Sequence, residues 1–373
     1  MSEAPARRDS LESTLRLCLI PGIGPRTRRA LIERFGCAAE VFRAAADELT
    51  AVTGVGRELC RRIVNAEATI DVLREIDLCR RAQIQILTET DSEYPRLLRD
   101  IHDPPGVLFC QGRLQSEDQL AVAIVGTRHA THYGRRQAEM LASGLARTGI
   151  TVVSGLARGI DAVAHRAALE AGGRTIAVLG SGLLNIYPPE HLELADEIAR
   201  KGVLLSELPP EMAPMSGTFP QRNRLISGLS LGVIVIEAAA RSGALISASH
   251  AAEQGRDVFA VPGPIDSRTS RGCHQLIRDG ARLVESVDDV LDELGPLVEA
   301  MPRSDGGEVR HPAELQLNDQ ERRVLDAIDV QPTEIDSIVV RSDLTISRVL
   351  STISVLEIRR LIRRVSGSAV VRL

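Results

Sequence analysis

Five segments of the sequence are built around glycine, serine, threonine or arginine, the residue types of anion-binding loops. They read Gly126-Thr127-Arg128, Ser154-Gly155-Leu156-Ala157-Arg158-Gly159-Ile160-Asp161, Gly180-Ser181-Gly182, Phe219-Pro220-Gln221-Arg222-Asn223-Arg224 and Arg241-Ser242-Gly243. Glycine lets backbone N–H groups approach a phosphate, and arginine adds a bidentate contact. One such loop is a weak indication, but five predict a phosphate-binding groove if the fold gathers them at one edge.

Short apolar runs alternate with helical segments of 10 to 15 residues around these loops, and they predict the elements that position them. The expected strands are 121–125, 150–153, 175–179, 203–205, 231–236 and 258–261. Continuous apolar strands that alternate with helices indicate βαβ units and a parallel sheet buried on both faces. The sequence therefore predicts an α/β fold with a Rossmann-like, doubly wound, mainly parallel sheet. Such sheets bind ligands at the carboxyl ends of their strands.

Known catalytic patterns are missing from the sequence. Lys201 is the single lysine and lies in Ala-Arg-Lys-Gly, which excludes a Walker-type phosphate loop. No G-x-G-x-x-G or H-E-x-x-H pattern occurs, no G-x-S-x-G pattern forms the elbow between a strand and a helix, and the eight histidines have no metal-ligand spacing. We expect no enzyme activity, no cofactor and no metal. Glu237 is the best acid for a hydrolase, but it could equally anchor Arg222 or Arg241, and Asp161 could simply complement a helix dipole.

The composition restricts the partners and the compartment. Five Phe, three Tyr and no Trp argue against a platform of many stacked aromatic rings, and the net charge of −5 gives no overall positive field. Any polyanion site must therefore be local. The six cysteines form no C-x-x-C pair, and no apolar run reaches 18 residues. We expect a cytoplasmic protein without a membrane span.

The regions on either side of the predicted sheet read as separate domains. Pro21-Gly22-Ile23-Gly24-Pro25 and Gly54-Val55-Gly56 each precede a predicted helix, which indicates a helix-hairpin-helix domain over residues 1–70. The Rossmann-like domain with its lead-in segment then covers 71–295. Residues 296–313 are rich in helix breakers and predict a linker. Three helices and a hairpin predict a winged helix over 314–373. Whether the first or the last domain touches DNA stays open.

The five loops, taken in order, resemble the DNA-processing protein A family (DprA, also called Smf). Further matches are Tyr94-Pro95, Asp103-Pro104-Pro105, Gly255-Arg256-Asp257-Val258-Phe259-Ala260-Val261-Pro262-Gly263 and Gly272-Cys273-His274-Gln275-Leu276-Ile277. The resemblance covers nearly the whole chain. It implies a bacterial, non-enzymatic mediator that binds and protects incoming single-stranded DNA in natural transformation and homologous recombination. It also implies loading of the RecA recombinase and a homodimer.

Carried over residue by residue, the resemblance places the DNA groove at the five loops, above all at Arg128, Arg158 and 219–224. The self-association surface would include His274 and Leu283. Arg158 replaces the lysine common in relatives, which keeps the charge and changes the donor geometry. Two other readings remain: a nucleotide-binding hydrolase on a related Rossmann-like fold, and a winged-helix regulator. The helix predicted at 345–358 offers only Arg348 as a cation for a DNA groove.

Overall fold

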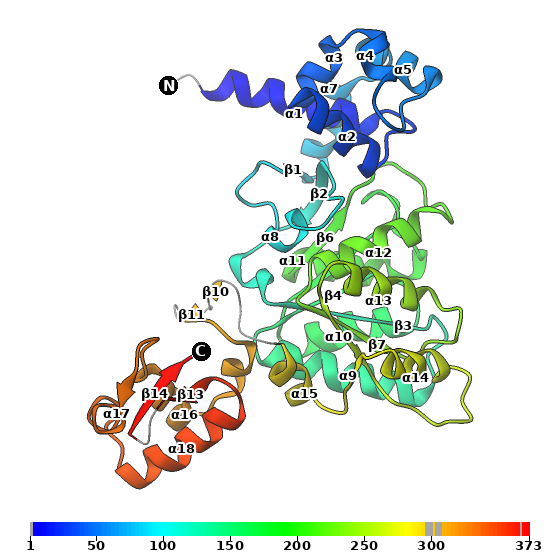
Figure 1. Cartoon of the computed structure of the whole chain (residues 1–373). Helices are drawn as coiled ribbons and strands as arrows, with labels where there is room; N and C mark the ends of the chain where they lie inside the picture. The colour runs from blue at the N-terminus through cyan, green and yellow to red at the C-terminus, as the bar shows by residue number, and fades with distance from the viewer. Residues whose placement is uncertain (1–2, 295–300, 303–307, 366–367) are drawn as a thin grey trace.

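The computed structural model describes residues 3–294, 301–302, 308–365 and 368–373 of the chain. A helical domain, a central sheet with helices on both faces, and a small C-terminal domain follow one another along the chain (Figure 1). The mostly parallel α/β core, the helix-hairpin-helix domain and the winged helix predicted from the sequence are all confirmed.

The central sheet has nine strands in the order β1-β2-β6-β5-β4-β3-β7-β8-β9. All neighbouring pairs from β6 to β9 are parallel, and β1 and β2 join antiparallel next to β6. The strand bounds are β1 Gln85–Thr88, β2 Val107–Gly112, β3 Ala121–Gly126, β4 Thr151–Ser154, β5 Thr175–Val178, β6 Val203–Ser206, β7 Gly232–Ile236, β8 Asp257–Ala260 and β9 Arg282–Leu283. Each predicted strand is present with its ends shifted by at most one residue.

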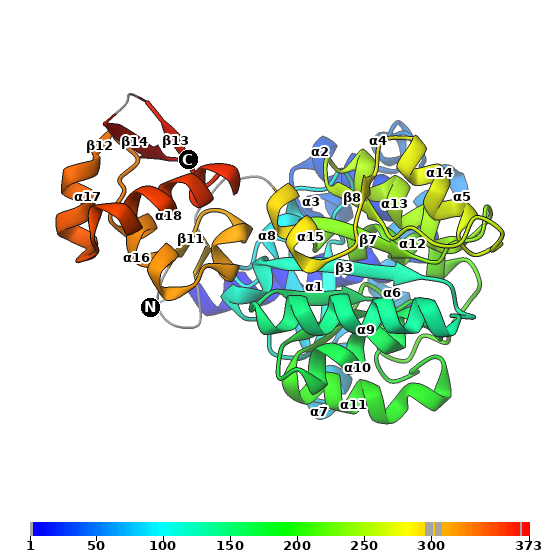
Figure 2. The ribbon, with the colours of Figure 1, turned by 90° about the horizontal axis from the view of Figure 1, so that it is seen from below.

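Alternating side chains of the central strands fill two separate cores, as a period of two requires. In β3, Ala121, Ala123 and Val125 face one core, whereas Val122 and Ile124 face the other. Figure 2 shows the two helical layers on opposite faces of the sheet. One layer contains α9 His132–Arg147, α10 Ile160–Glu170 and α11 Leu192–Lys201; the other contains α12 Thr218–Gly228, α13 Gly243–Glu253 and α14 Arg271–Arg278. A short helix, α15 Val287–Glu293, packs on the α9 side.

The direction of the connections reverses between β3 and β7. The chain runs from β3 through β4 and β5 to β6 on one side, and then returns to place β7, β8 and β9 on the other. Strands β3 and β7 are hydrogen-bonded neighbours whose carboxyl ends, Gly126 and Ile236, are in register. Such a switch point opens a crevice where open α/β sheets bind ligands.

The N-terminal domain contains two glycine hairpins of similar design. Gly22 and Gly54 have φ values of +98° and +90°, a region that favours glycine. Gly24 and Gly56 then cap α2 and α5 in extended conformation. The helix bounds are α1 Glu3–Leu19, α2 Pro25–Phe35, α3 Ala38–Arg43, α4 Ala46–Thr50, α5 Arg57–Val64, α6 Ala66–Thr69 and α7 Val72–Arg81. The two predicted helices after the hairpins are confirmed.

The segment between this domain and β3 contains two strands that sequence patterns did not predict. Helix α7 ends at Arg81, and β1 pairs with β2 through four residues of register. Both strands are short, and the turn-rich stretch 89–106 separates them, with the single helical turn α8 Arg96–Arg99. Their stability comes from docking against β6, which is distant in sequence, so local patterns give little signal.

The C-terminal domain consists of α16 Asp319–Asp326, α17 Ile335–Ser342 and α18 Ile346–Ile358 with strands β12 Thr333–Glu334, β13 Ile362–Arg364 and β14 Ala369–Arg372. Asn318 caps α16, since its side chain accepts a hydrogen bond from the Glu321 N–H. Most of the predicted linker lies outside the described residues. Its last residues are packed structure, because Val309, His311 and Ala313 are buried and Pro312 begins the 3-10 helix η3 Pro312–Gln316.

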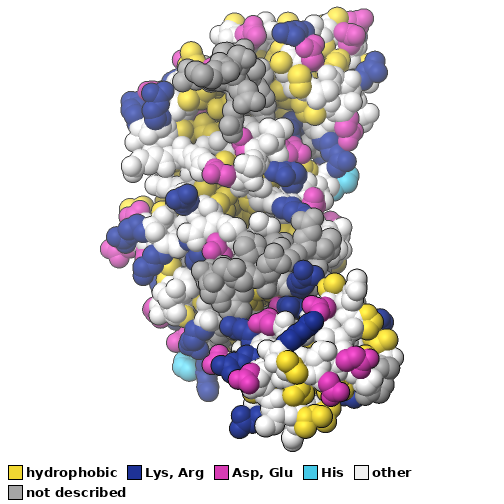
Figure 3. Space-filling view, turned by 90° about the vertical axis from the view of Figure 1, so that its left-hand side faces the viewer, with side chains coloured by type: hydrophobic (Ala, Val, Ile, Leu, Met, Phe, Trp, Pro, Cys, Tyr) yellow, Lys and Arg dark blue, Asp and Glu magenta, His cyan; other side chains and the backbone are white. Residues whose placement is uncertain are grey.

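Basic and acidic side chains are interspersed on the face shown in Figure 3, without a broad field of one sign. In the same view apolar side chains gather on the C-terminal domain, where Val340, Ile346 and Ile358 are exposed. Within the described residues no helix is long and apolar enough to cross a membrane. The same part of the chain contains no cluster of three or more His, Cys, Asp or Glu side chains able to hold a metal ion.

Candidate nucleic-acid interface

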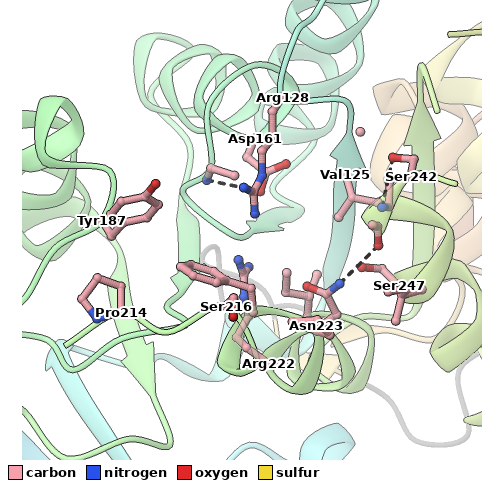
Figure 4. Close-up of a pocket in the computed structure, with 18 of the residues that line it drawn as sticks. Val125, Arg128, Asp161, Tyr187, Pro214, Ser216, Arg222, Asn223, Ser242 and Ser247 are labelled. Atoms are coloured by element: carbon pink, nitrogen blue, oxygen red, sulfur yellow. Dashed lines mark hydrogen bonds between the residues drawn. The ribbon is translucent and has the colours of Figure 1, made fainter. Parts of the chain in front are cut away.

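A cavity of about 590 Å³ lies at the switch point of the sheet. Its wall combines the carboxyl end of β3, the loop after β4, the segment before α12, the first turns of α12 and the start of α13. Figure 4 shows the side chains of these elements around one open space. Seven of the predicted site residues line it: Gly126, Arg128, Phe219, Arg222, Asn223, Ser242 and Gly243.

Two arginines and two aromatic rings form a row at the cavity, and three of the four, Arg128, Tyr187 and Phe219, line it. The Tyr187 and Phe219 rings have centroids 5.6 Å apart at an interplanar angle of 53°. The Arg128 guanidinium lies 5.6 Å from the Phe219 centroid, and that of Arg158 lies 6.0 Å from the Tyr187 centroid. These cation–π contacts hold two exposed cations beside half-buried rings. The row can therefore offer a base a stacking surface and a phosphate a charge.

Arg222 places a buried cation at the cavity. Only 5% of the residue is exposed, and its Nη2 donates to the Gly155 carbonyl oxygen over 3.1 Å. Its Nε and Nη1 have no hydrogen-bond partner among the described residues. Burial lowers the pKa of Arg222 to about 10, so the group is still charged at neutral pH. A buried cation with unused donors is costly unless an acceptor completes it.

The loop after β4 is shaped around this guanidinium. A Cβ on Gly155 would lie 1.7 Å from Arg222 Nη1, so only glycine fits there. Asp161, also buried, accepts hydrogen bonds from the Gly155 and Ala157 N–H groups. Burial raises the pKa of Asp161, and the nearby charge of Arg222 opposes that shift. Asp161 thus holds the loop in place, a larger role than the dipole complement expected from the sequence.

Asn223, Ser242 and Gly243 connect α12 to α13 at the opposite side of the cavity. The Asn223 side chain donates to the Gly243 carbonyl oxygen over 3.3 Å. Ser242 caps α13 by accepting from the Ala244 N–H. The Ala244 and Leu245 N–H groups both donate to Ser242, so the start of α13 is capped where it lines the cavity.

Several predicted residues shape the loops without lining the cavity. A Cβ on Gly180 would lie 2.7 Å from the Phe219 ring, and one on Gly159 would lie 2.2 Å from the Thr127 carbonyl oxygen. Gly182 donates its N–H to Met212. Ser154 is fully buried, and its hydroxyl donates to the Ile124 carbonyl oxygen. Ser154 therefore has a structural position that a ligand does not reach.

Four other predicted residues do not line this cavity. Arg224 is 5% exposed and points away from the cavity, where it pairs with Glu207 and Asp103, so the expectation of a phosphate contact is corrected to a structural ion pair. Gln221 is exposed and lines a neighbouring cavity. Arg241 is exposed on the loop before α13, and Arg158 contacts Glu190 as well as Tyr187.

Glu237 anchors neither Arg222 nor Arg241. Its carboxylate accepts from the Thr131 N–H, the Thr131 hydroxyl and the Thr269 hydroxyl, and its carbonyl oxygen accepts from the Thr127 N–H. The residue fixes the loop that carries Arg128. It does not line the cavity, which removes it as the acid of a hydrolase in that site.

Tyr187 lines the cavity beside Phe219, although the sequence patterns did not single it out. It follows the Gly180-Ser181-Gly182 loop by five residues, outside any pattern of glycine and arginine. The small number of aromatic residues could have pointed to Tyr187. A single ring next to an anion-binding loop is a candidate for base stacking.

The two predicted self-association residues lie on neighbouring elements at the β9 edge of the sheet. His274 is on α14, and its Nε2 lies 3.0 Å from the Gly263 carbonyl oxygen. Leu283 is 46% exposed on β9, the last strand of the sheet. An apolar side chain on an edge strand suits pairing with another surface.

Comparison with protein families assigns each part of the chain. Residues 85–295 match the family described as DNA recombination-mediator protein A. Residues 308–368 match the DprA winged helix domain, and residues 15–68 match a SAM-like helix-hairpin-helix tandem.

Individual relatives agree with that assignment. Protein Smf of Synechocystis is 36% identical over 93% of this chain and 95% of its own length. DNA processing protein DprA of Bacillus subtilis is 46% identical over 58% of this chain and 73% of its own.

Solved structures give the same answer for the fold. DNA processing protein A of Streptococcus pneumoniae is 36% identical with a TM-score of 0.68, over 76% of this chain and 97% of that one. The protein from Helicobacter pylori, described for its single-stranded DNA binding mode, is 33% identical with a TM-score of 0.51 over 56% and 95% of the two chains. The resemblance read from the loops is confirmed, and the chain belongs to the DNA recombination-mediator protein A family.

Proposed function

We propose that this chain binds single-stranded DNA in the cavity at the sheet's switch point and serves as a non-enzymatic recombination mediator. The observation that carries the proposal is Arg222, a buried charged guanidinium whose Nε and Nη1 have no partner among the described residues. A backbone phosphate supplies the acceptor oxygens and the negative charge that these donors lack.

The adjoining row of rings favours a single strand over a duplex. Tyr187 and Phe219 can stack only on a base that is not already stacked in a helix. Arg128 and Arg158 border the rings and can neutralise neighbouring phosphates. Because phosphate contacts and stacking are insensitive to sequence, we expect binding of all sequences with similar affinity.

Binding of a labelled oligothymidylate, followed by fluorescence anisotropy, tests the proposal. Arg222→Met keeps the apolar stem and removes the charge, and it should weaken binding by roughly ten- to a hundredfold. Arg81→Ala, which removes an exposed cation of α7, is the matched control and should bind normally. Equal affinity of wild type and Arg222→Met, or a preference for duplex, would refute the assignment of the cavity.

The relationship to recombination mediators extends the proposal to RecA. We infer that the protein, when it is bound to single-stranded DNA, delivers that DNA to RecA. We also infer that it acts as a homodimer through the surface that contains His274 and Leu283. RecA strand exchange on DNA precoated with single-strand-binding protein should speed up when the chain is added. No stimulation would limit the function to DNA binding. Leu283→Glu should shift the mass in solution to that of a monomer, because it puts a charge in an apolar contact.

A further inference from the structure

A second cavity, of about 550 Å³, lies on the other side of the first turn of α12. Phe219 and Arg222 face the first cavity, whereas Thr218 and Gln221 face the second. Met215, 48% exposed, lines both. In Figure 1 the dark-blue turn between α1 and α2 lies beside the green loop that precedes α12. The two cavities are therefore consecutive along one surface.

The far wall of the second cavity is the first glycine hairpin of the N-terminal domain, residues 20–25. Arg28 donates the first helical hydrogen bond of α2 to Gly24, and Pro25 has no N–H. The Arg26 and Thr27 N–H groups therefore have no acceptor within the 11-residue helix, and no side chain caps it. Arg62 lies at the same turn, where its Nη1 donates to the Pro21 carbonyl oxygen over 2.8 Å.

A buried cation again has an unused donor. Arg28 lines the second cavity with only 8% of the residue exposed, and its Nε has no hydrogen-bond partner in the described part of the chain. Its Nη2 forms an ion pair with Glu89 and donates to the Pro104 carbonyl oxygen, so Arg28 offers the Nε donor and not an uncompensated charge. Glu207, which also lines the cavity, has its charge compensated by Arg224. An anion can therefore approach the hairpin without meeting a free carboxylate from that wall.

The rest of the cavity wall is apolar. Ile23, Leu208, Met212 and Met215 contribute hydrocarbon and thioether surface between the hairpin and α12. Methionine adapts its shape to a flat ring and makes favourable contacts with it. The cavity thus repeats the chemistry of the first one, with a cationic and amide-rich side for a phosphate and an apolar side for a base.

We propose that a single strand held in the first cavity continues past Met215 into the second, where the hairpin and Arg28 receive a backbone phosphate. This inference rests on the proposed function, because it extends the same strand. Under this inference the N-terminal domain contacts DNA. The bound strand is then longer than the first cavity alone can hold.

The second hairpin, Gly54-Val55-Gly56, supplies a matched control. Gly56 caps α5 with φ −82° and ψ 172°, close to the φ −90° and ψ 173° of Gly24, and it does not line the cavity. A Cβ added at either glycine meets nothing within 4 Å. Aspartate is a better N-cap than glycine, so Gly24→Asp and Gly56→Asp should both keep the fold.

The experiment measures the affinity of the full chain for oligothymidylates of roughly 4 to 16 nucleotides, the range of known single-strand sites. Wild type should gain affinity as the strand outgrows the first cavity. Gly24→Asp should lose about fivefold in affinity for long strands, the effect of one like-charge contact at about 4 Å in water, and should bind short strands normally. Gln221→Glu, on the opposite wall and in another domain, should do the same, whereas Gly56→Asp should match wild type.

The outcomes separate the two proposals. If long strands bind Gly24→Asp and Gln221→Glu as tightly as wild type, the extended path is wrong while the first cavity stands. If Gly56→Asp weakens long strands as much as Gly24→Asp, the effect is general repulsion and the path is again wrong. If wild type does not bind short strands at all, the proposed function fails and this inference with it.

Discussion

Arg222 and Arg224 lie two residues apart on α12, and each exposes 5% of its surface, yet their surroundings differ completely. The Arg224 guanidinium donates to Glu207 and to the Asp103 carbonyl oxygen, and its Nε lies 3.4 Å from the Asp103 carboxylate. Arg222 has one carbonyl oxygen as its acceptor and two unused nitrogens beside an open cavity.

The contrast separates a cation that holds the fold together from one that is available to a ligand. Arg224 connects α12 to β6 and to the lead-in segment, so its charge is already compensated. Arg222 has Asp161 nearby, but that carboxylate accepts from two backbone N–H groups instead. A buried cation that has no carboxylate paired with it indicates an anionic ligand more strongly than an exposed cation does.

The largest expected effect is on stability in a matched pair of variants. Arg224→Met leaves Glu207 buried without its partner and should lower the free energy of unfolding by about 3–5 kcal/mol. Arg222→Met removes a guanidinium that was never fully satisfied and should cost less than half of that. Urea denaturation of both variants measures the difference, and equal losses would erase the contrast.

In DNA binding, Arg222→Met should have the larger effect of the two variants. Arg224→Met, measured at a temperature where it is folded, should bind short strands that occupy only the first cavity as wild type does, because its side chain does not line that cavity. Arg222→Met should show the ten- to hundredfold loss predicted above. Weak binding by a folded Arg224→Met would show that the two positions do not divide structure from function.

Arg128 shows how an exposed cation at the same cavity compares with the buried Arg222. It stacks on Phe219 at the rim and is already solvated, so Arg128→Ala should weaken binding by only roughly three- to tenfold, equally for every sequence. Loss of one phosphate contact should also reduce the log–log salt slope by about 0.7. An unchanged slope, measured by anisotropy at several salt concentrations, would mean that Arg128 contacts no phosphate.

The smallest effect expected near neutral pH concerns His165. This residue accepts a hydrogen bond from the loop after β4, the loop to which Arg222 donates. Burial, reinforced by the Arg222 charge, lowers the pKa of His165 to about 3. Its Nε2 accepts from the Leu156 N–H, and its Nδ1 contacts the Thr175 hydroxyl, which donates to the Val152 carbonyl oxygen. The neutral ring fits both contacts and has no room for a second proton.

Unfolding therefore takes up a proton at His165 between its folded pKa of about 3 and its ordinary value of 6.5. This contribution to stability is complete above pH 6.5 and falls by about 1.4 kcal/mol for each pH unit below it. His165→Gln should flatten that part of the pH dependence relative to wild type in urea titrations. Identical slopes in the two proteins would show that the site accepts a second cation beside Arg222.

Much of the fold follows from local patterns. The apolar runs located β3 to β8 within one residue at each end, because strands buried on both faces need continuous apolar sequence. The Gly-x-Gly spacing marked both hairpins. Strands β1 and β2 were missed since β2 pairs with β6, about a hundred residues further along the chain, and β1 joins the sheet only through β2.

The site was predictable as a set of loops but not as a set of side-chain roles. Glycines with positive φ or close backbone contacts, such as Gly159, belong to loops that the sequence picks out by composition. Ser154 and Arg224 have the same residue types as ligand contacts, and only their neighbours in space make them structural.

The sequence by itself determined the parallel sheet, the flanking domains and the edge where anion-binding loops gather, because these depend on local periodicity and on the handedness of βαβ connections. The tertiary structure decided which cations are free. Arg224 meets Asp103 across 121 positions of sequence, and Arg222 meets Gly155 across 67. The charge of a side chain is a property of its type, whereas the compensation of that charge depends on which distant segments fold against it.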